Sequence, residues 1–215
     1  MTLEDTFQHK GLRKKLVDEI RGKGITDERI LDAINKVPRH LFMDSSFIKF
    51  AYRDQAFPIG AGQTISQPFT VAFQTQLLEI NPQDKVMEIG TGSGYQAAIL
   101  AELGTKVFTV ERQRELFLKS QALLNRLNYR INFFYGDGGA GLPTYGPFDR
   151  IIITAAAPEV PVKLLEQLKP GGKMVLPLGK KNAQVMMVID KVNDNEYKKT
   201  EHGTFVFVPM LRGKQ

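Results

Sequence analysis

The sequence contains no cysteine and no tryptophan, and only three of its 215 residues are histidine. Without cysteine the protein cannot form disulfides, thiol nucleophiles or thiolate metal sites. No apolar run approaches the roughly 20 residues that a membrane-spanning helix requires. The first residues also lack the basic and then apolar pattern of a secretory signal. We therefore expect a cytoplasmic protein without a membrane partner.

Positive charge is in modest excess, because 29 lysines and arginines stand against 23 acids and give a net charge of +6. The basic residues are scattered, and they do not alternate with aromatic residues as a groove for single-stranded nucleic acid requires. We interpret this charge as a solvated surface and expect no nucleic-acid partner. The length suits one sizeable core, and we expect a monomer.

The first third of the chain is predicted to contain three helices and one long irregular segment. Apolar residues recur at helical spacing over 6–22 and 26–36, and Thr26 is the expected N-cap of the second helix. Residues 38–66 are irregular, and such a length is uncommon in a segment without a function. The third helix is predicted over 68–80.

From residue 85 onward, predicted strands and helices alternate. The strands are expected at 85–89, 106–110, 131–135 and 149–154, and the helices at about 94–103, 113–128 and 160–168. This alternation predicts a parallel sheet with helices on both faces. Further strands are expected at 173–178, 184–191 and 204–210. Only a turn separates the first two of these, which indicates an antiparallel hairpin at one edge of the sheet.

The predicted fold class is therefore α/β, with a mostly parallel, Rossmann-like sheet and additional N-terminal helices. We expect an N-terminal helical extension over residues 1–80, with a loop at about 52–68, and a Rossmann-like core over residues 81–215. The two parts are expected to form one compact unit.

Residues 86–95 carry the most informative motif. Four residues suited to a buried strand include Glu88, and they are followed by glycines at alternate positions, Gly90, Gly92 and Gly94. A turn without Cβ atoms lets the backbone approach a ligand closely. A predicted helix follows directly, so the motif lies where nucleotide-like cofactors bind in open α/β sheets.

The glycines alone do not identify the cofactor, because they also fit the G-x-G-x-x-A pattern of dinucleotide sites. Glu111 ends the second predicted strand, where it is placed to bind ribose hydroxyls or simply to start a helix. Asp137, before Gly138, is placed to accept from an adenine amino group or to form a turn. Glu88 in an apolar strand end needs a positively charged partner, such as the ammonium of a methionine moiety. Together these acids favour S-adenosylmethionine over a nicotinamide dinucleotide.

Residues 52–68, with the sequence YRDQAFPIGAGQTISQP, carry the most specific pattern. They resemble the segment Y-x-D-x-x-x-P-I-G-x-G-Q-T-I-S-Q-P of bacterial protein-L-isoaspartate (D-aspartate) O-methyltransferases. The resemblance continues through Val37-Pro38-Arg39, Phe148–Ile151, Ala155–Pro158, Leu168–Gly172 and Phe207–Pro209, and so covers nearly the whole chain. Phe57 and Met210 stand where leucine is usual, which we interpret as apolar exchanges.

The resemblance implies a class I S-adenosylmethionine-dependent methyltransferase that modifies the free carboxylate of L-isoaspartyl residues in peptides and proteins. The by-product would be S-adenosylhomocysteine, and no metal is expected. Ser66 is the residue that the resemblance associates with activity, and the implied substrate-binding residues are Asp54, Thr64, Ile65 and Ser66. The expected cofactor-binding residues are Glu88, Gly90, Gly92, Gly94, Glu111, Asp137 and Gly138. Without the resemblance, Ser66 is interpreted as a turn or capping residue, and Asp54 as a residue that orders the loop.

A carboxylate acceptor suits this residue set, because it is ionised at neutral pH and needs no general base. His40 is accordingly interpreted as structural. Three alternatives remain at this stage. They are a methyltransferase that acts on RNA or a small molecule, a non-catalytic module that binds the cofactor and damaged peptides, and a nicotinamide dehydrogenase.

Overall fold

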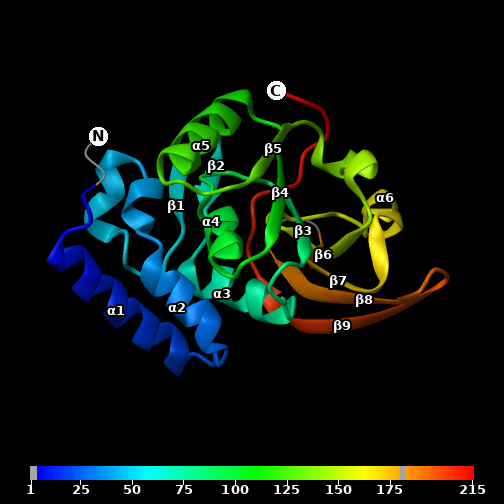
Figure 1. Ribbon diagram of the computed structural model, residues 1–215, viewed down its shortest axis with the longest axis horizontal. Coiled ribbons are helices and arrows are strands. Elements are labelled where there is room, and N and C mark those ends of the chain that lie inside the picture. Colours follow the sequence, from blue (N-terminus) through cyan, green and yellow to red (C-terminus); the bar gives the residue numbers. More distant parts are fainter. Residues whose placement is uncertain (1–3, 180–182) are drawn as a thin grey trace.

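A seven-stranded sheet forms the centre of the molecule (Figure 1), in a computed structural model that describes residues 4–179 and 183–215. The strands are β3 (Lys85–Ile89), β4 (Lys106–Glu111), β5 (Asn132–Tyr135), β6 (Phe148–Ile153), β7 (Leu168–Leu178), β8 (Gln184–Asn193) and β9 (Glu196–Phe205). Their order across the sheet is β5-β4-β3-β6-β7-β8-β9. The first five strands in this order are parallel, and β8 and β9 are antiparallel to their neighbours. The predicted fold class is confirmed.

Helices cover the two faces of the sheet unequally. The helices are α1 (Phe7–Gly22), α2 (Glu28–Lys36), α3 (Pro68–Leu77), α4 (Tyr95–Glu102), α5 (Arg114–Arg126) and α6 (Val162–Glu166). On one face, Val86, Val107 and Ile152 share a core with buried residues of α1 to α5. On the other face, Met87 and Ile151 pack in a second core with α6. Because side chains of a strand alternate between faces, neighbouring residues of β3 belong to different cores.

The N-terminal helices lie where they were expected, and their ends are capped by side chains. Thr6 accepts a hydrogen bond from the backbone of His9 and forms a capping box at the start of α1. The predicted N-cap of α2 was wrong by one residue, because Asp27 and not Thr26 accepts from the Arg29 amide. A carboxylate there also interacts favourably with the positive end of the helix.

The segment 38–66, predicted to be irregular, contains short regular elements. It forms two 3-10 helices, η1 (Arg39–Phe42) and η2 (Ser45–Phe50), and then an antiparallel hairpin of β1 (Phe57–Gly60) and β2 (Gln63–Ile65). The short strands lack a length of alternating residues that sequence patterns could detect.

The C-terminal part of the prediction was right for one hairpin and wrong for the last strand. β7 and β8 pair antiparallel from Lys173 opposite Asp190 to Leu178 opposite Val185, as expected. The strand predicted at 204–210 lies instead at Glu196–Phe205, and beyond it only Pro209 forms an isolated bridge, to Ala156. The sequence of β9 is mostly charged and polar, as is common for an exposed edge strand, so apolar alternation did not reveal it. The predicted helix 160–168 is also shorter, since Leu168 already belongs to β7.

The start of the chain is held by a cluster of charged and aromatic side chains. Asp5 pairs with Arg13 at 3.0 Å, and Arg13 donates to the Tyr52 hydroxyl, which lies 2.7 Å from His40 Nδ1. His40 is buried and stacks on His9, so its expected structural role agrees with its contacts. Asp5, His9 and His40 are close enough to share a metal ion, but the Arg13 guanidinium already neutralises the one carboxylate among them.

Within the described residues, no helix combines the length and the apolar character that crossing a membrane requires.

Candidate active site

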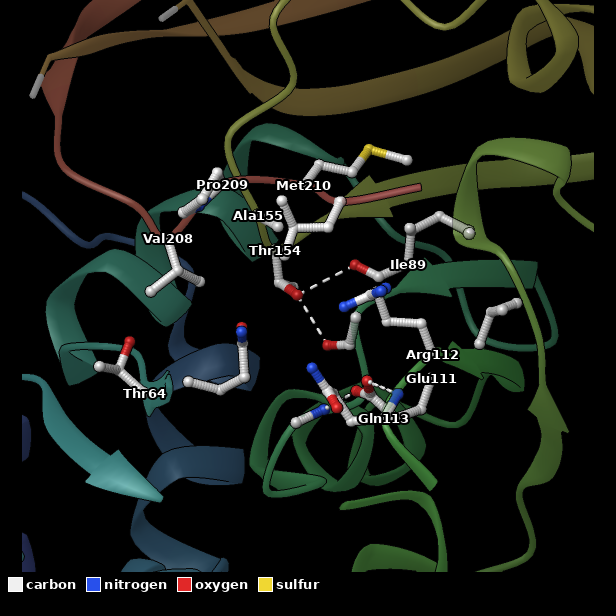
Figure 2. A pocket seen from close by; sticks show the side chains of 16 residues that line it. Thr64, Ile89, Glu111, Arg112, Gln113, Thr154, Ala155, Val208, Pro209 and Met210 are labelled. Atoms are coloured by element: carbon white, nitrogen blue, oxygen red, sulfur yellow. Dashed lines mark hydrogen bonds between the residues drawn. The ribbon is translucent and has the colours of Figure 1, made fainter. Parts of the chain in front are cut away.

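The strand order reverses between β3 and β6, and a pocket opens at the carboxyl ends of these strands. The chain runs from β3 outward to β4 and β5 and then returns to β6 on the other side of β3. In open α/β sheets this reversal leaves a crevice that binds ligands. The pocket is lined by Gln63, Thr64, Ile89, Gly90, Gly92, Val110, Glu111, Arg112, Gln113, Gly138, Thr154, Ala155, Val208, Pro209, Met210 and Leu211. Figure 2 shows Thr64 on one side, the segment Val208–Met210 along the upper rim, and Glu111 with Gln113 on the lower side.

The glycine loop, residues 90–94, forms the floor between β3 and α4. Gly90 has a φ of +96° and Gly94 a φ of +87°, which side chains other than glycine rarely adopt. A Cβ atom on Gly90 would lie 2.7 Å from Thr154 Oγ1, and one on Gly94 would lie 2.6 Å from Leu124 Cδ1. Gly90 and Gly92 both line the pocket. The structure therefore places Gly90 and Gly92 on the pocket wall, whereas Gly94 does not line the pocket and packs against Leu124 of α5.

Glu111 lies in the pocket, where the sequence analysis expected it. Its Oε2 accepts from the Gly92 amide and its Oε1 from the Gln113 amide, each at 2.8 Å. The carboxylate therefore braces the glycine loop from the neighbouring strand. Each carboxylate oxygen has a second acceptor position, so the same group can still bind hydroxyls of a ligand.

Gly138 lines the pocket, whereas Asp137 does not. Asp137 Oδ1 accepts from the Gly139 amide at 2.9 Å, and Oδ2 accepts from the Gly213 amide at 2.8 Å. These contacts match the turn interpretation and add an anchor for the C-terminal tail. The expected contact of Asp137 with an adenine amino group stays a prediction.

Glu88 is fully buried one layer below the pocket. It lies opposite Thr109 in the parallel register, and Thr109 Oγ1 donates to Glu88 Oε2 at 2.5 Å. The Thr109 hydroxyl is also 2.6 Å from the hydroxyl of Thr91 in the glycine loop. Oε1 of Glu88 has no hydrogen-bond partner among the described residues. Burial raises the pKa of Glu88 to about 8, and the nearby Glu111 adds to this rise.

The hairpin β1–β2 brings Ser66 to the glycine loop. A second, smaller cavity is lined by Thr64, Ile65, Ser66, Val71, Gly90, Thr91, Gly92, Ser93, Tyr95, Gln96 and Thr154. Ser66 is half-buried, and its hydroxyl bonds to no other residue in the described parts of the chain. It does not cap α3, whose N-cap is Gln67. The capping interpretation of Ser66 is therefore not supported, and its hydroxyl is free for a ligand.

Asp54 performs the capping that was considered for Ser66. Its side chain is 2% exposed, and it accepts from the Phe69 amide at 2.7 Å, from Gln67 Nε2 at 2.8 Å and from Lys23 Nζ at 2.6 Å. It lines neither of the two cavities. These contacts favour the interpretation that Asp54 orders the loop.

Several pocket residues were not anticipated as site residues, and two groups among them have contacts that explain their position. The first is the tail Val208–Leu211, which is drawn in red in Figure 1 and is paired with Ala156 through 2.8 Å hydrogen bonds. Arg112 holds the end of this tail by donating to the carbonyls of Arg212 and Gly213. The second is Thr154, which donates to the carbonyls of Ile89 and Gly90. Because Thr154 directly follows β6, the sequence could have predicted that it lines the pocket. The sequence pattern did not show that the tail returns to the pocket.

Comparison with known proteins identifies the family. The family model of the protein-L-isoaspartate (D-aspartate) O-methyltransferases matches residues 11–215. A protein-L-isoaspartate O-methyltransferase of Flavobacterium psychrophilum is 56% identical over 213 residues, which are 99% of this chain and 100% of the relative. The chain belongs to this family. It is therefore an S-adenosylmethionine-dependent methyltransferase, as the sequence analysis expected.

Solved structures agree with this assignment. A protein-L-isoaspartate O-methyltransferase structure matches with a TM-score of 0.84 and 28% identity, over 92% of this chain and 65% of that longer chain. A Plasmodium falciparum structure, described as a protein of the same kind in complex with S-adenosyl-L-homocysteine, matches with a TM-score of 0.81 and 23% identity. That match covers 93% of this chain and 98% of the other. At this identity the second likeness supports the class I methyltransferase fold alone.

The residues of the pocket fit the cofactor of the family. A Cβ on Gly90 would collide with Thr154, so the backbone there remains bare, and Glu111 offers at the end of β4 the acceptors that ribose hydroxyls require. Glu88 Oε1 is a buried acceptor without a partner next to the same loop. Such an unsatisfied carboxyl is costly, and a nearby positive charge would compensate this cost.

We predict that cofactor binding releases a proton from Glu88. With its pKa at about 8, Glu88 is mostly protonated at pH 7, and an ammonium group near the glycine loop lowers that pKa. Binding at pH 7 is therefore expected to release a proton, and affinity should rise as the pH rises from about 6 to 8. Calorimetric titration with S-adenosylhomocysteine, in two buffers of different ionisation enthalpy, measures this release.

The variant Glu88→Gln should bind more weakly and release no proton. Glu201→Gln, which changes an exposed acid on β9, is the matched control and should behave as the unaltered protein. Equal binding heats in both buffers would show that Glu88 does not ionise on binding.

Proposed function

We propose that this enzyme methylates the free carboxylate of L-isoaspartyl residues in damaged proteins, and so initiates their repair, with Ser66 orienting that carboxylate. The observation that carries the proposal is the free hydroxyl of Ser66 in a cavity that it shares with the glycine loop. The family assignment supports the reaction, and the contacts of the site support the roles of the residues.

The acceptor needs no activation by the enzyme. A carboxylate with a pKa near ~4 is ionised at neutral pH, so no side chain has to remove a proton. S-adenosylmethionine supplies a methyl group bonded to a positively charged sulfur, which a carboxylate oxygen can attack directly. The protein then has to orient one carboxylate oxygen, and correct orientation alone supplies several kcal/mol of the barrier.

Hydroxyl donors suit this task better than a charged donor. Ser66 and Thr64 both line the cavity beside the glycine loop. A hydroxyl holds the carboxylate through a hydrogen bond and leaves negative charge on the attacking oxygen, whereas an ammonium group would neutralise more of it. In this proposal Ser66 is the principal donor, Thr64 assists, and Ile65 places both.

The pocket around the reacting groups is partly apolar. Ile89, Val110, Val208 and Met210 line it. An apolar wall excludes water that would otherwise solvate the carboxylate. Since the anion and the cation neutralise each other during transfer, a dry site does not oppose the reaction.

The proposal also keeps the expectations of a cytoplasmic monomer that has neither a nucleic-acid nor a membrane partner. The expectation of no nucleic-acid partner is supported by the scattered basic residues of the sequence and by the pairing of many basic side chains with acids, such as Lys36 with Glu102 and Lys169 with Asp149.

The direct test compares two peptides that differ only in one linkage. Methyl transfer from labelled S-adenosylmethionine is measured on an isoaspartyl peptide and on its normal aspartyl twin. We expect label on the isoaspartyl peptide alone. Equal labelling of both peptides would indicate another acceptor, and cofactor binding without labelling would indicate a non-catalytic module.

The variant Ser66→Ala should lower kcat/KM for the isoaspartyl peptide by about 10- to 150-fold, because a hydrogen bond to a charged group contributes roughly 1.5–3 kcal/mol. Cofactor affinity should change much less. Ser45→Ala, at an exposed serine of η2, is the matched control and should keep full activity. Full activity in Ser66→Ala would remove Ser66 from the mechanism.

A further inference from the structure

Arg39 is a fully buried cation with no acidic partner at ion-pair distance in the described parts of the chain. Burial lowers its pKa to about 10, so the guanidinium remains charged at neutral pH. Asp54 is an acid whose charge acts on it, but Asp54 is itself paired with Lys23. A buried charge without a paired acid is costly. An uncharged side chain would fill the same space at a lower cost, so packing alone does not explain this arginine.

The hydrogen bonds of Arg39 all go to the segment that carries Ser66. Nε donates to the carbonyl of Ala51 at 3.1 Å, and Nη2 donates to the carbonyl of Gln55 at 3.2 Å. The shortest of these bonds, 2.9 Å, runs from Nη2 to the carbonyl of Ser66 itself. A planar guanidinium fixes the directions of such bonds, which a lysine cannot do. The one side chain therefore holds three points of the loop from η2 to α3.

Arg39 also contacts the cofactor side of the site. Its Cζ atom lies 4.9 Å from the ring centre of Tyr95, the first residue of α4, which follows Gly94 directly. Tyr95 lines the same small cavity as Ser66. The guanidinium thus lies between the segment 51–66, which carries Ser66, and the start of α4.

Polar atoms without partners gather around this contact. Nη1 of Arg39, the Tyr95 hydroxyl and Gln96 Oε1 are buried and form no hydrogen bond of normal geometry among the described residues, although the guanidinium and the Tyr95 hydroxyl interact with each other. Unsatisfied buried polar groups are uncommon in folded proteins and call for an explanation. Three of them beside the Ser66 cavity indicate an arrangement that serves the site at some cost to stability.

We propose that Arg39 is a positioning residue for methyl transfer, which fixes the backbone of Ser66 so that its hydroxyl faces the acceptor carboxylate. This inference rests on the proposed role of Ser66. Arg39 does not touch the reacting atoms, because it acts through the Ser66 carbonyl.

The test uses Arg39→Lys, which keeps the charge but not the planar fork. Because small displacements of a positioned group slow a reaction strongly, we expect kcat for the isoaspartyl peptide to fall by about 10- to 100-fold. The dissociation constant of S-adenosylhomocysteine should change by less than about threefold, since Arg39 makes no hydrogen bond to the glycine loop. Unchanged kcat, or an equal loss of cofactor affinity, would overturn the proposal.

Arg13→Lys is the matched control. Arg13 is also buried and also donates to a backbone carbonyl, that of Asn35, but its contacts with the loop are with the hydroxyl and the ring of Tyr52 and not with the Ser66 backbone. This variant should lower the unfolding temperature and leave kcat unchanged. A fall in kcat equal to that of Arg39→Lys would mean that both arginines act only through stability.

A double-mutant cycle with Ser66→Ala separates positioning from a general structural effect. If Arg39 acts through Ser66, then Arg39→Lys should lower kcat/KM by less than about threefold in the Ser66→Ala background. If the two substitutions lower kcat/KM by factors that multiply in the double variant, Arg39 does not act through Ser66 and the proposal is overturned. If Ser66→Ala alone has full activity, the proposed function of Ser66 fails instead, so the two failures are distinguishable. Should Arg39→Lys not fold, Arg39→Gln, which keeps two N–H donors without the buried charge, takes its place in the cycle. Its effect on kcat/KM should again be less than about threefold in the Ser66→Ala background, and independent effects would again overturn the proposal.

Discussion

The bare backbone of the glycine loop is the constraint on which the rest of the site depends. The loop has room for no side chain at Gly90 or Gly94, because Thr154 and Leu124 occupy those directions. A Cβ on Gly92 would lie 3.5 Å from Ile59 of the β1–β2 hairpin. The loop therefore lies in close contact with Thr154, which follows β6, and with Leu124 of α5. The pocket and the smaller cavity share Gly90 and Gly92, where the wall has no side chains.

Charge balance at this wall explains the composition of the site. Glu111 accepts two backbone amides, Glu88 is held protonated by burial, and Arg39 remains charged within the protein. None of these groups is needed to remove a proton from the acceptor. In the proposed reaction the hydroxyls of Thr64 and Ser66 orient the acceptor carboxylate, and Arg39 fixes the backbone of Ser66. This division suits a reaction whose difficulty is alignment.

Local signals in the sequence were sufficient for the parallel sheet and the glycine loop. The apolar runs of β3 and β6, and glycines at alternate positions, report directly on buried strands and a tight turn. The resemblance in residues 52–68 then pointed to Ser66. Sequence could not reveal β9, which is polar, or the tail Val208–Leu211, which reaches the pocket by tertiary contacts. It also could not show that Asp54 caps α3, because that bond joins residues fifteen positions apart.

The most direct test of the account is the pH profile of kcat/KM for an isoaspartyl peptide at saturating S-adenosylmethionine. Saturation removes the protonation of Glu88 from the profile. If the pocket orients an acceptor that is already ionised, the profile should be level from about pH 6 to 8, because the acceptor titrates near ~4. A fall of kcat/KM toward low pH, with a midpoint near neutrality, would contradict the account if replacing one enzyme side chain, such as His40, abolished that pH dependence. Such a result would identify the side chain as a general base.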